Sequence, residues 1–202
     1  MRYIITSLFI LAFTLSFAQT SKTRSLLRSI EGEWKTDDKG NVVYVQIVEA
    51  AELSKEEIYT RALDYFTYNY NNGKSVIQTK DPEKGRILAK GIYQNVHSAY
   101  EVFLVTKVST HHIVQVDIKE GRARIIITLN QMDHVSTDSE GESIYHAYAM
   151  SECYPVNPRG RSKTVGGKAF YKSHVQVLHT FDKLEKAIKE GNTDQTIAGD
   201  DW

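Results

Sequence analysis

The sequence predicts an α+β fold in the order strand, helix, four strands, helix. Two segments place apolar residues at the spacing of an amphipathic helix, one early in the chain and one near its C-terminal end. Between them, two pairs of β-like segments meet at glycine-containing turns of the hairpin type. The 202-residue chain has a suitable length for one domain with an ordinary hydrophobic core.

Residues 1–18 have the pattern of a cleaved signal peptide. Arg2 precedes an apolar segment, and Ser16 and Ala18 are small residues at the positions that signal peptidase requires. A membrane anchor is the alternative, but the apolar run is shorter than the roughly 20 residues that span a bilayer. We therefore expect export to the periplasm or beyond, with Gln19 as the first mature residue and no transmembrane segment after cleavage.

Residues 19–41 are polar and are predicted to be flexible, so the ordered domain is expected to cover residues 42–191. The first strand is predicted at "VVYVQIVEA", residues 42–50. Its alternation places Val43, Val45 and Ile47 on one face, which we expect to be buried.

The first helix is predicted within residues 53–74. Ser54 and Glu57 have the spacing of a capping box, and Asn72-Gly73 suits a helix end. The apolar stripe recurs every four residues: Ile58, Ala62, Phe66 and Tyr70.

The stretch "KDPEKGRILAKGIYQNV", residues 80–96, raises the choice between a phosphate-binding loop and a hairpin. A phosphate loop needs closely spaced glycines and a helix directly afterwards. Here Gly85 and Gly91 are six residues apart and β-like residues follow, so we predict a hairpin. A second hairpin joins residues 113–119 and 122–129 at Glu120-Gly121. Residues 96–110 either extend a strand or form a short insertion.

The C-terminal third begins with a segment that lacks periodicity. Residues 137–167 are predicted to be irregular, and a segment of this length without regular structure is usually functional or disordered. A helix then ends at Gly191, and residues 192–202 are predicted to be a disordered acidic tail. The apolar stripe of this helix is Phe170, His174, Val177, Phe181, Leu184 and Ile188.

Four segments together resemble an exported family, typical of Bacteroidota, described as a domain of unknown function with a TBP-like fold. The segments are "VVYVQIVEA", "SKEEIYTRALDYF", "GRILAKG" and "IVQVDIKEGRARIIIT". The resemblance covers roughly residues 42–133 and does not extend to residues 137–167. It implies a curved antiparallel sheet with both helices packed on one face. It brings no known activity and no catalytic residues.

Charge and histidine spacing exclude several functional classes. Removal of Arg2 with the signal peptide leaves one more acidic than basic residue, which argues against nucleic acid as a partner. His111 and His112 are adjacent and point to opposite faces of a strand. His174 and His179 are five residues apart, too far for two ligands on one helical face. We therefore predict no metal site and no cofactor.

Catalytic candidates lack a surrounding signature. Cys153 is the only cysteine, so no internal disulfide forms, and it is a candidate nucleophile with His146 or His134 as base. A carboxylate pair for glycoside hydrolysis is a further candidate. Its members would be Glu152 with Asp138 or Glu140. We predict no catalytic residue among these.

The leading functional hypothesis is a non-enzymatic binding or interaction module of the cell envelope, with an unknown protein or small ligand as partner. Tyrosine and arginine are enriched at binding interfaces, and a sheet with helices on one face leaves its other face open. The alternative is an envelope hydrolase with a site around residues 137–167. The predicted binding residues in that segment are Tyr145, Tyr148, Tyr154, Arg159 and Arg161. Those on the open sheet face are Lys90, Gln94, Gln115 and Lys119.

Overall fold

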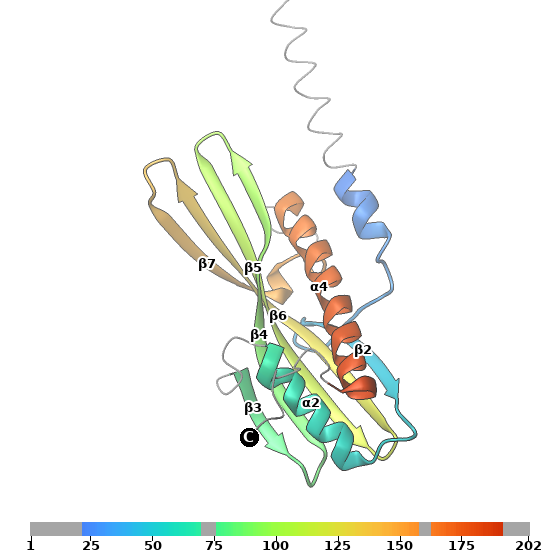
Figure 1. Ribbon diagram of the computed structural model, residues 1–202. Coiled ribbons are helices and arrows are strands. Elements are labelled where there is room, and N and C mark those ends of the chain that lie inside the picture. The colour runs from blue at the N-terminus through green and yellow to red at the C-terminus, as the bar shows by residue number, and fades with distance from the viewer. Residues whose placement is uncertain (1–21, 70–75, 158–162, 192–202) are drawn as a thin grey trace, which may run out of the picture.

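The computed structural model describes residues 22–69, 76–157 and 163–191, and it has the predicted α+β architecture (Figure 1). Helices α2 (Lys55–Asn69) and α4 (Lys163–Glu190) pack on one face of an antiparallel sheet. The signal peptide, the acidic tail and the predicted helix end at Asn72-Gly73 lie outside the described residues.

The sheet is built mainly from three long strands. These are β4 (Arg86–Glu101), β5 (Leu104–Lys119) and β6 (Arg122–Asp138), which pair in sequence order. Shorter strands flank them: β1 (Lys35–Thr36), β2 (Val42–Glu49), β3 (Ile77–Asp81) and β7 (Ser143–Ala149). The spatial order is β1-β2-β6-β5-β4-β3, with β7 also paired to β6. The predicted order of strand, helix, four strands and helix is therefore confirmed, with β1 and β7 added.

Strand β6 pairs with two different strands along one of its edges. Its first half, residues 122–129, pairs with β2, and its second half, residues 131–137, pairs with β7. The β4–β5 and β6–β7 hairpins consequently project beyond the part of the sheet that contains β2 (Figure 1). Residues 96–110, which the sequence left open, extend β4 and β5.

The hairpin predicted at residues 80–96 is present. The β3–β4 turn closes with a hydrogen bond from the Gly85 amide to the Pro82 carbonyl at 3.1 Å. Gly85 has φ of 64°, and a Cβ there would collide with the Ile118 carbonyl oxygen. This combination of a left-handed backbone and a close approach requires glycine.

The two helices bury the predicted stripes. Ile58, Ala62 and Phe66 of α2 are fully buried, and all six predicted positions of α4 are buried. The fourth predicted position of the first stripe, Tyr70, lies outside the described residues. At the start of α2, the Ser54 Oγ accepts a hydrogen bond from the Glu57 amide at 3.2 Å. The Glu57 carboxylate instead pairs with Arg61 at 2.6 Å, so only half of the predicted capping box forms as expected.

Polar groups on α4 fix its position over the sheet. The Ser173 hydroxyl bonds to Thr110 on β5 at 2.8 Å, and the Thr180 hydroxyl bonds to Tyr93 on β4 at 2.8 Å. His112 stacks on Tyr93 with ring centroids 3.8 Å apart. Burial lowers the pKa of His112 to about 3, so this imidazole is neutral in the folded core.

The prediction for the buried face of the first strand is wrong. Val42, Tyr44 and Val48 of β2 are buried beneath the helices, whereas Val45 and Ile47 are 58% and 51% exposed. Both faces of this strand are apolar, so alternation alone does not choose between them. The helices pack on the face that carries Tyr44, whose hydroxyl lies 3.3 Å from the His174 imidazole of α4.

The prediction that residues 19–41 are flexible is wrong from residue 22 onward. A helix at residues 22–28 is followed by β1, which pairs with β2. Thr23 and Ile30 are buried, and Trp34 packs against Phe170. The domain therefore includes the segment ahead of residue 42.

The prediction that residues 137–167 are irregular is also wrong. Strand β7 occupies residues 143–149, the 3-10 helix η1 (Met150–Glu152) follows, and α4 begins at Lys163. The side chain of Met150 is fully buried, and Cys153 and Tyr154 pack against the core. The sequence pattern failed here because β7 lies at a sheet edge and is largely exposed, so it has no alternation of apolar and polar residues.

Candidate ligand-binding surface

The face of the sheet opposite the two helices carries a mixed apolar and charged surface. Its residues alternate with the buried ones along each strand. Val45 on β2 pairs with Ile126 on β6, and Ile126 pairs with Gln115 on β5. Since Val45 and Ile47 are more than half exposed, this face offers apolar contact area to solvent or to a ligand.

A basic pocket lies at the end of this face, near the β3–β4 and β5–β6 turns. Its volume is about 370 Å³. Five of the lining residues are cationic and one is a carboxylate, so the pocket has an excess of positive charge. The lining residues are Ile47, Lys84, Arg86, Asp117, Ile118, Lys119, Arg122, Ala123 and Arg124.

Asp117 orients the two arginines on either side of it. Its carboxylate accepts hydrogen bonds from Arg86 Nε and from Arg124, each at 2.7 Å, and from Gln115 at 2.9 Å. These residues occupy three neighbouring strands in cross-strand register. Burial by itself would raise the pKa of Asp117, but the hydrogen bonds from Arg124, Arg86 and Gln115 outweigh it and lower that pKa.

The other three cations of the pocket are Lys84, Lys119 and Arg122. Lys84 pairs with Asp81 at 3.0 Å. Arg122 and Lys119 are exposed and directly opposite one another across β5 and β6. Neither has an ion-pair partner in the part of the chain that the structure describes. An anionic group that enters the pocket would therefore meet two uncommitted cations beside two arginines already held in place.

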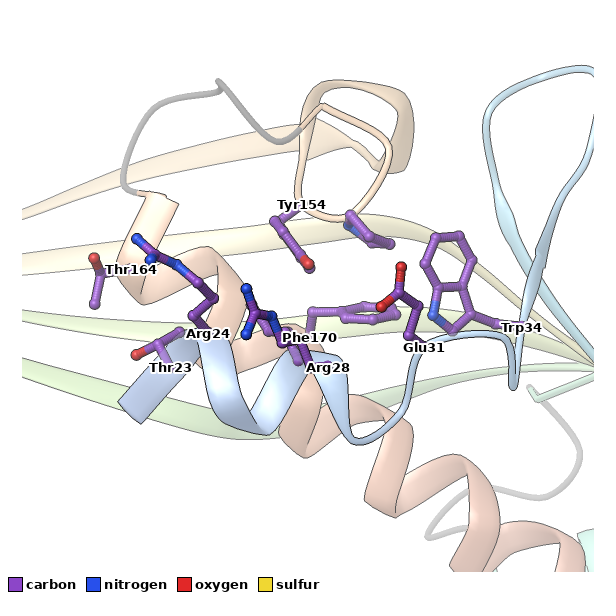
Figure 2. A pocket seen from close by; sticks show the side chains of 10 residues that line it. Thr23, Arg24, Arg28, Glu31, Trp34, Tyr154, Thr164 and Phe170 are labelled. Carbon is purple, nitrogen blue, oxygen red and sulfur yellow. The ribbon is translucent and has the colours of Figure 1, made fainter. Parts of the chain in front are cut away.

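A second cavity, of about 480 Å³, lies between the helix at residues 22–28 and α4 (Figure 2). Phe170 forms its floor, and Trp34 and Tyr154 contribute aromatic surface. Figure 2 shows Arg24 and Arg28 extending from the helix toward the side on which Tyr154 lies. The other lining residues are Thr23, Leu27, Glu31, Pro155 and Thr164.

The predicted open-face residues fall at different points of the sheet. Lys119 lines the basic pocket, and Gln115 lies beside it through its bond to Asp117. Lys90 and Gln94 are exposed on β4 but do not line this pocket.

The predicted binding residues within residues 137–167 do not form one site with the predicted residues of the open sheet face. Tyr145 is exposed on β7, where a hydrogen bond to Asp133 raises its pKa. Tyr148 is half-buried, with its ring 5.1 Å from that of His134. Tyr154 lines the second cavity. Arg159 and Arg161 lie outside the described residues.

Sequence reasoning missed Arg86, Arg122 and Arg124. A usable signal was present, because Arg122 and Arg124 are two residues apart on one strand and therefore share a face. Recognising their partners required the register between β4, β5 and β6, which the sequence does not state.

The surroundings of Cys153, the candidate nucleophile, disfavour its ionised form. Burial raises the pKa of the Cys153 thiol to about 11, which disfavours the thiolate that nucleophilic attack requires. No hydrogen bond joins this thiol to His134 or His146 among the described residues. Instead, His134 and His146 face each other across β6 and β7.

The carboxylate candidates are similarly engaged with the backbone. Asp138 accepts hydrogen bonds from the amides of Glu140 and Glu142, each at 2.9 Å, and so closes the β6–β7 turn. Glu152 accepts from the Ala149 amide at 3.1 Å.

Metal-ligand clusters and membrane-spanning helices are both absent from the described residues. No group of three or more His, Cys, Asp or Glu side chains is placed to hold a metal ion within them. None of the helices in that part of the chain is long and apolar enough to cross a membrane.

Comparison with solved structures identifies the fold. A DUF4468 family protein from Bacteroides ovatus ATCC 8483 is similar to the chain, with a TM-score of 0.52 and 16% identity over 81% of this chain and 94% of that one. A TBP-like protein from Parabacteroides distasonis ATCC 8503 has a TM-score of 0.56 and 19% identity over 77% of this chain and 97% of that one. No curated protein matches the chain.

The matching family model is that of a domain of unknown function (DUF4468) with TBP-like fold, and it covers residues 44–131. The basic pocket lies wholly inside this range, whereas the second cavity lies wholly outside it. The resemblance seen in the sequence is thereby confirmed: the chain has a TBP-like fold and matches the DUF4468 family over residues 44–131.

Proposed function

We propose that this protein is an exported, non-enzymatic binding module of the cell envelope that recognises an anionic ligand through the face of the sheet opposite its helices. The basic pocket is the observation that carries the proposal. It combines five cations with one carboxylate on a surface that neither α2 nor α4 covers.

Preorganisation favours binding at this pocket. Asp117 holds Arg86 and Arg124 at 2.7 Å, so these long side chains lose less conformational freedom when a ligand arrives. Arg122 and Lys119 add two positive charges that Asp117 does not neutralise. A carboxylate or phosphate group matches the fork geometry of guanidinium groups.

The apolar residues next to the pocket define the rest of the ligand. Ile47 lines the pocket itself, and Val45 and Ile126 continue the surface away from it. A ligand with an anionic group next to an apolar group would contact both parts. Such a pattern is typical of interfaces that combine apolar contact area with arginine.

The raised pKa of Cys153 supports a binding role over the alternative of an envelope hydrolase. At neutral pH the thiol is protonated, and Asp138 and Glu152 are engaged in backbone turns.

Export rests on the pattern of residues 1–18 and is tested by the intact mass of the protein from the cell envelope. That mass should correspond to a chain beginning at Gln19, and retention of residues 1–18 would refute cleavage at this site.

Calorimetric titration of the mature chain with hexaglutamate and with pyrophosphate tests the ligand class. The variant Lys119→Gln/Arg122→Gln removes two cations of the pocket, and Lys172→Gln/Lys186→Gln removes two exposed cations of α4 as the matched control. We expect one binding site for at least one probe, with affinity at least about tenfold weaker in the pocket variant, equivalent to about 1.4 kcal/mol. The control should bind within about twofold of the wild type.

Two results would contradict the proposal. One is the absence of binding by both probes. The other is an equal loss of affinity in the two variants, because binding would then follow net charge rather than the pocket.

A further inference from the structure

The second cavity lies in segments that surround the part of the chain matched by the family model. It is formed by the helix at residues 22–28 with Trp34, by the turn at Tyr154 and Pro155, and by the first turns of α4. We propose that this cavity binds an acidic sugar, a pyranose ring that carries a carboxylate. This site is separate from the basic pocket, and the inference does not depend on the proposed function.

The aromatic residues form an open platform. The rings of Trp34 and Phe170 are 5.6 Å apart at 81°, and those of Tyr154 and Phe170 are 5.9 Å apart at 57°. Neither Trp34 nor Tyr154 therefore stacks face to face on Phe170. A sugar needs only one aromatic face, because the C–H groups of a pyranose pack on the ring while its hydroxyls point outward.

Polar groups surround this platform on several sides. Thr164 lines the cavity with a hydroxyl-bearing side chain and Glu31 contributes a carboxylate, whereas Thr23 is buried and already has a partner of its own. Glu31 also lies near Tyr154, where burial and the negative charge of Glu31 together raise the pKa of the tyrosine. An aromatic surface bordered by hydroxyl and carboxylate groups matches the alternation of C–H and O–H groups on a sugar.

Two arginines specify an acidic ligand. Arg24 and Arg28 are four residues apart and therefore project from one face of the helix, toward the cavity (Figure 2). Neither has an ion-pair partner in the described ranges of the chain. Guanidinium groups bind carboxylates through paired hydrogen bonds, so a uronic acid carboxylate would be held at the arginine side while its ring contacts Trp34 or Tyr154.

The cavity is preformed and of suitable size. Its volume of about 480 Å³ lies within the range of about 300–1,000 Å³ of small-molecule sites. The helix at residues 22–28 is seated on α4, where a Cβ on Gly167 would lie 3.0 Å from Leu27 and 3.3 Å from Thr23. This close contact fixes the helix that carries the two arginines relative to α4, the helix of Phe170.

Trp34 supplies a direct readout of binding. The chain contains two tryptophans, Trp34 and Trp202, so Trp202→Phe leaves Trp34 as the single emitter. In this background the mature chain is titrated with digalacturonate, with its neutral counterpart digalactose, and with inorganic phosphate. We expect a saturable change in Trp34 fluorescence with digalacturonate, and binding of digalactose at least tenfold weaker.

Single substitutions separate the arginines from general charge. Arg24→Gln and Arg28→Gln should each weaken digalacturonate binding at least fivefold. Lys22→Gln, on the same helix but outside the cavity, should leave it within twofold. All three residues are exposed, so circular dichroism should show a folded domain in each variant.

Equal affinity for digalactose would show that the arginines do not select an acidic sugar. An identical response to inorganic phosphate would show that the sugar ring is not recognised. Unchanged binding in both arginine variants, or an equal loss in Lys22→Gln, would overturn the assignment of the site.

Discussion

Asp117 is the residue on which the geometry of the basic pocket depends. Its carboxylate is 18% exposed and joins Arg86 on β4 to Arg124 on β6. Without its charge, two guanidinium groups of like charge would flank β5 from β4 and β6 with no carboxylate between them. Asp117 therefore both positions the arginines and limits the charge of the pocket.

Asp117→Asn should lower the free energy of unfolding at pH 7 by about 1 kcal/mol, a modest value because both arginines are half exposed. The pKa of Asp117 is lowered in the folded state, so its contribution is present above the unfolded-state pKa. It is lost as the pH falls through the folded-state pKa, below the ordinary value of 3.8. Denaturant unfolding of both proteins between pH 7 and pH 3 measures this.

The difference between the wild type and Asp117→Asn should therefore shrink in the most acidic samples. A difference that stays constant down to pH 3 would mean that the charge of Asp117 has no role in stability.

Single residues of the site were only partly predictable. Lys119 and Gln115 were found because alternation placed them on the face opposite the helices. The arginines were not, since their importance comes from a carboxylate and two cations meeting across three strands. Tyr154 was singled out for its type, but its place beside Phe170 depends on the packing of a segment that was predicted to be irregular.

At the scale of elements, strand β2 shows that alternation of residues cannot identify the buried face when both faces are apolar. Its sequence "VVYVQIVE" is apolar on both faces, and the choice of buried face follows from which side the helices cover. The neighbouring strands β5 and β6 bury Val114, Val116, Ile125 and Ile127 on the helix side. Pairing with β6 then forces Val42, Tyr44 and Val48 onto the same side.

A matched pair of substitutions tests the face of β2. Val48→Thr places a hydroxyl in the fully buried core and should cost about 1–3 kcal/mol. Val45→Thr changes the same atoms on the exposed face and should stay within about 0.5 kcal/mol. Chemical denaturation of both variants measures the difference, and equal costs, or the reverse order, would contradict the arrangement.

The segment after β6 is part of the folded domain. Met150→Ala should cost about 2–5 kcal/mol, because this side chain is fully buried where η1 meets β6. Ile144→Ala, on the exposed part of β7, serves as the control and should stay within about 0.5 kcal/mol. If thermal unfolding showed no effect of Met150→Ala, the segment would not be part of the core, in line with the prediction that residues 137–167 are irregular.

The elements with strong periodicity were predicted correctly, and those without it were not. The stripes of α2 and α4 and the turns at Gly85 and Gly121 depend on local sequence, so they were recognisable. Strand β7 and the helix at residues 22–28 are stabilised by contacts with distant parts of the chain. Their backbone structure is therefore decided by packing and not by local pattern.

For the whole molecule, the fold separates two surfaces with different surroundings. The basic pocket is built from β2, the β3–β4 turn, β4, β5 and β6, all within the range that matches the family. The second cavity is built from the helix at residues 22–28, the turn after η1 and α4, all outside that range. Ligands of the two sites should accordingly bind independently, since no described residue lines both.

The most direct test of the central claim is a map of where an anionic ligand binds on the mature chain. Methyl-group NMR of labelled isoleucine and valine follows Ile47, Val45 and Ile126 on the open face, and Val48 and Ile125 on the buried face. During titration with pyrophosphate or hexaglutamate, we predict saturable shifts of Ile47 first, with smaller shifts of Val45 and Ile126. Shifts confined to methyl groups of α4 or of β7, or no saturable shift with either probe, would contradict the claim that the open face is the binding surface.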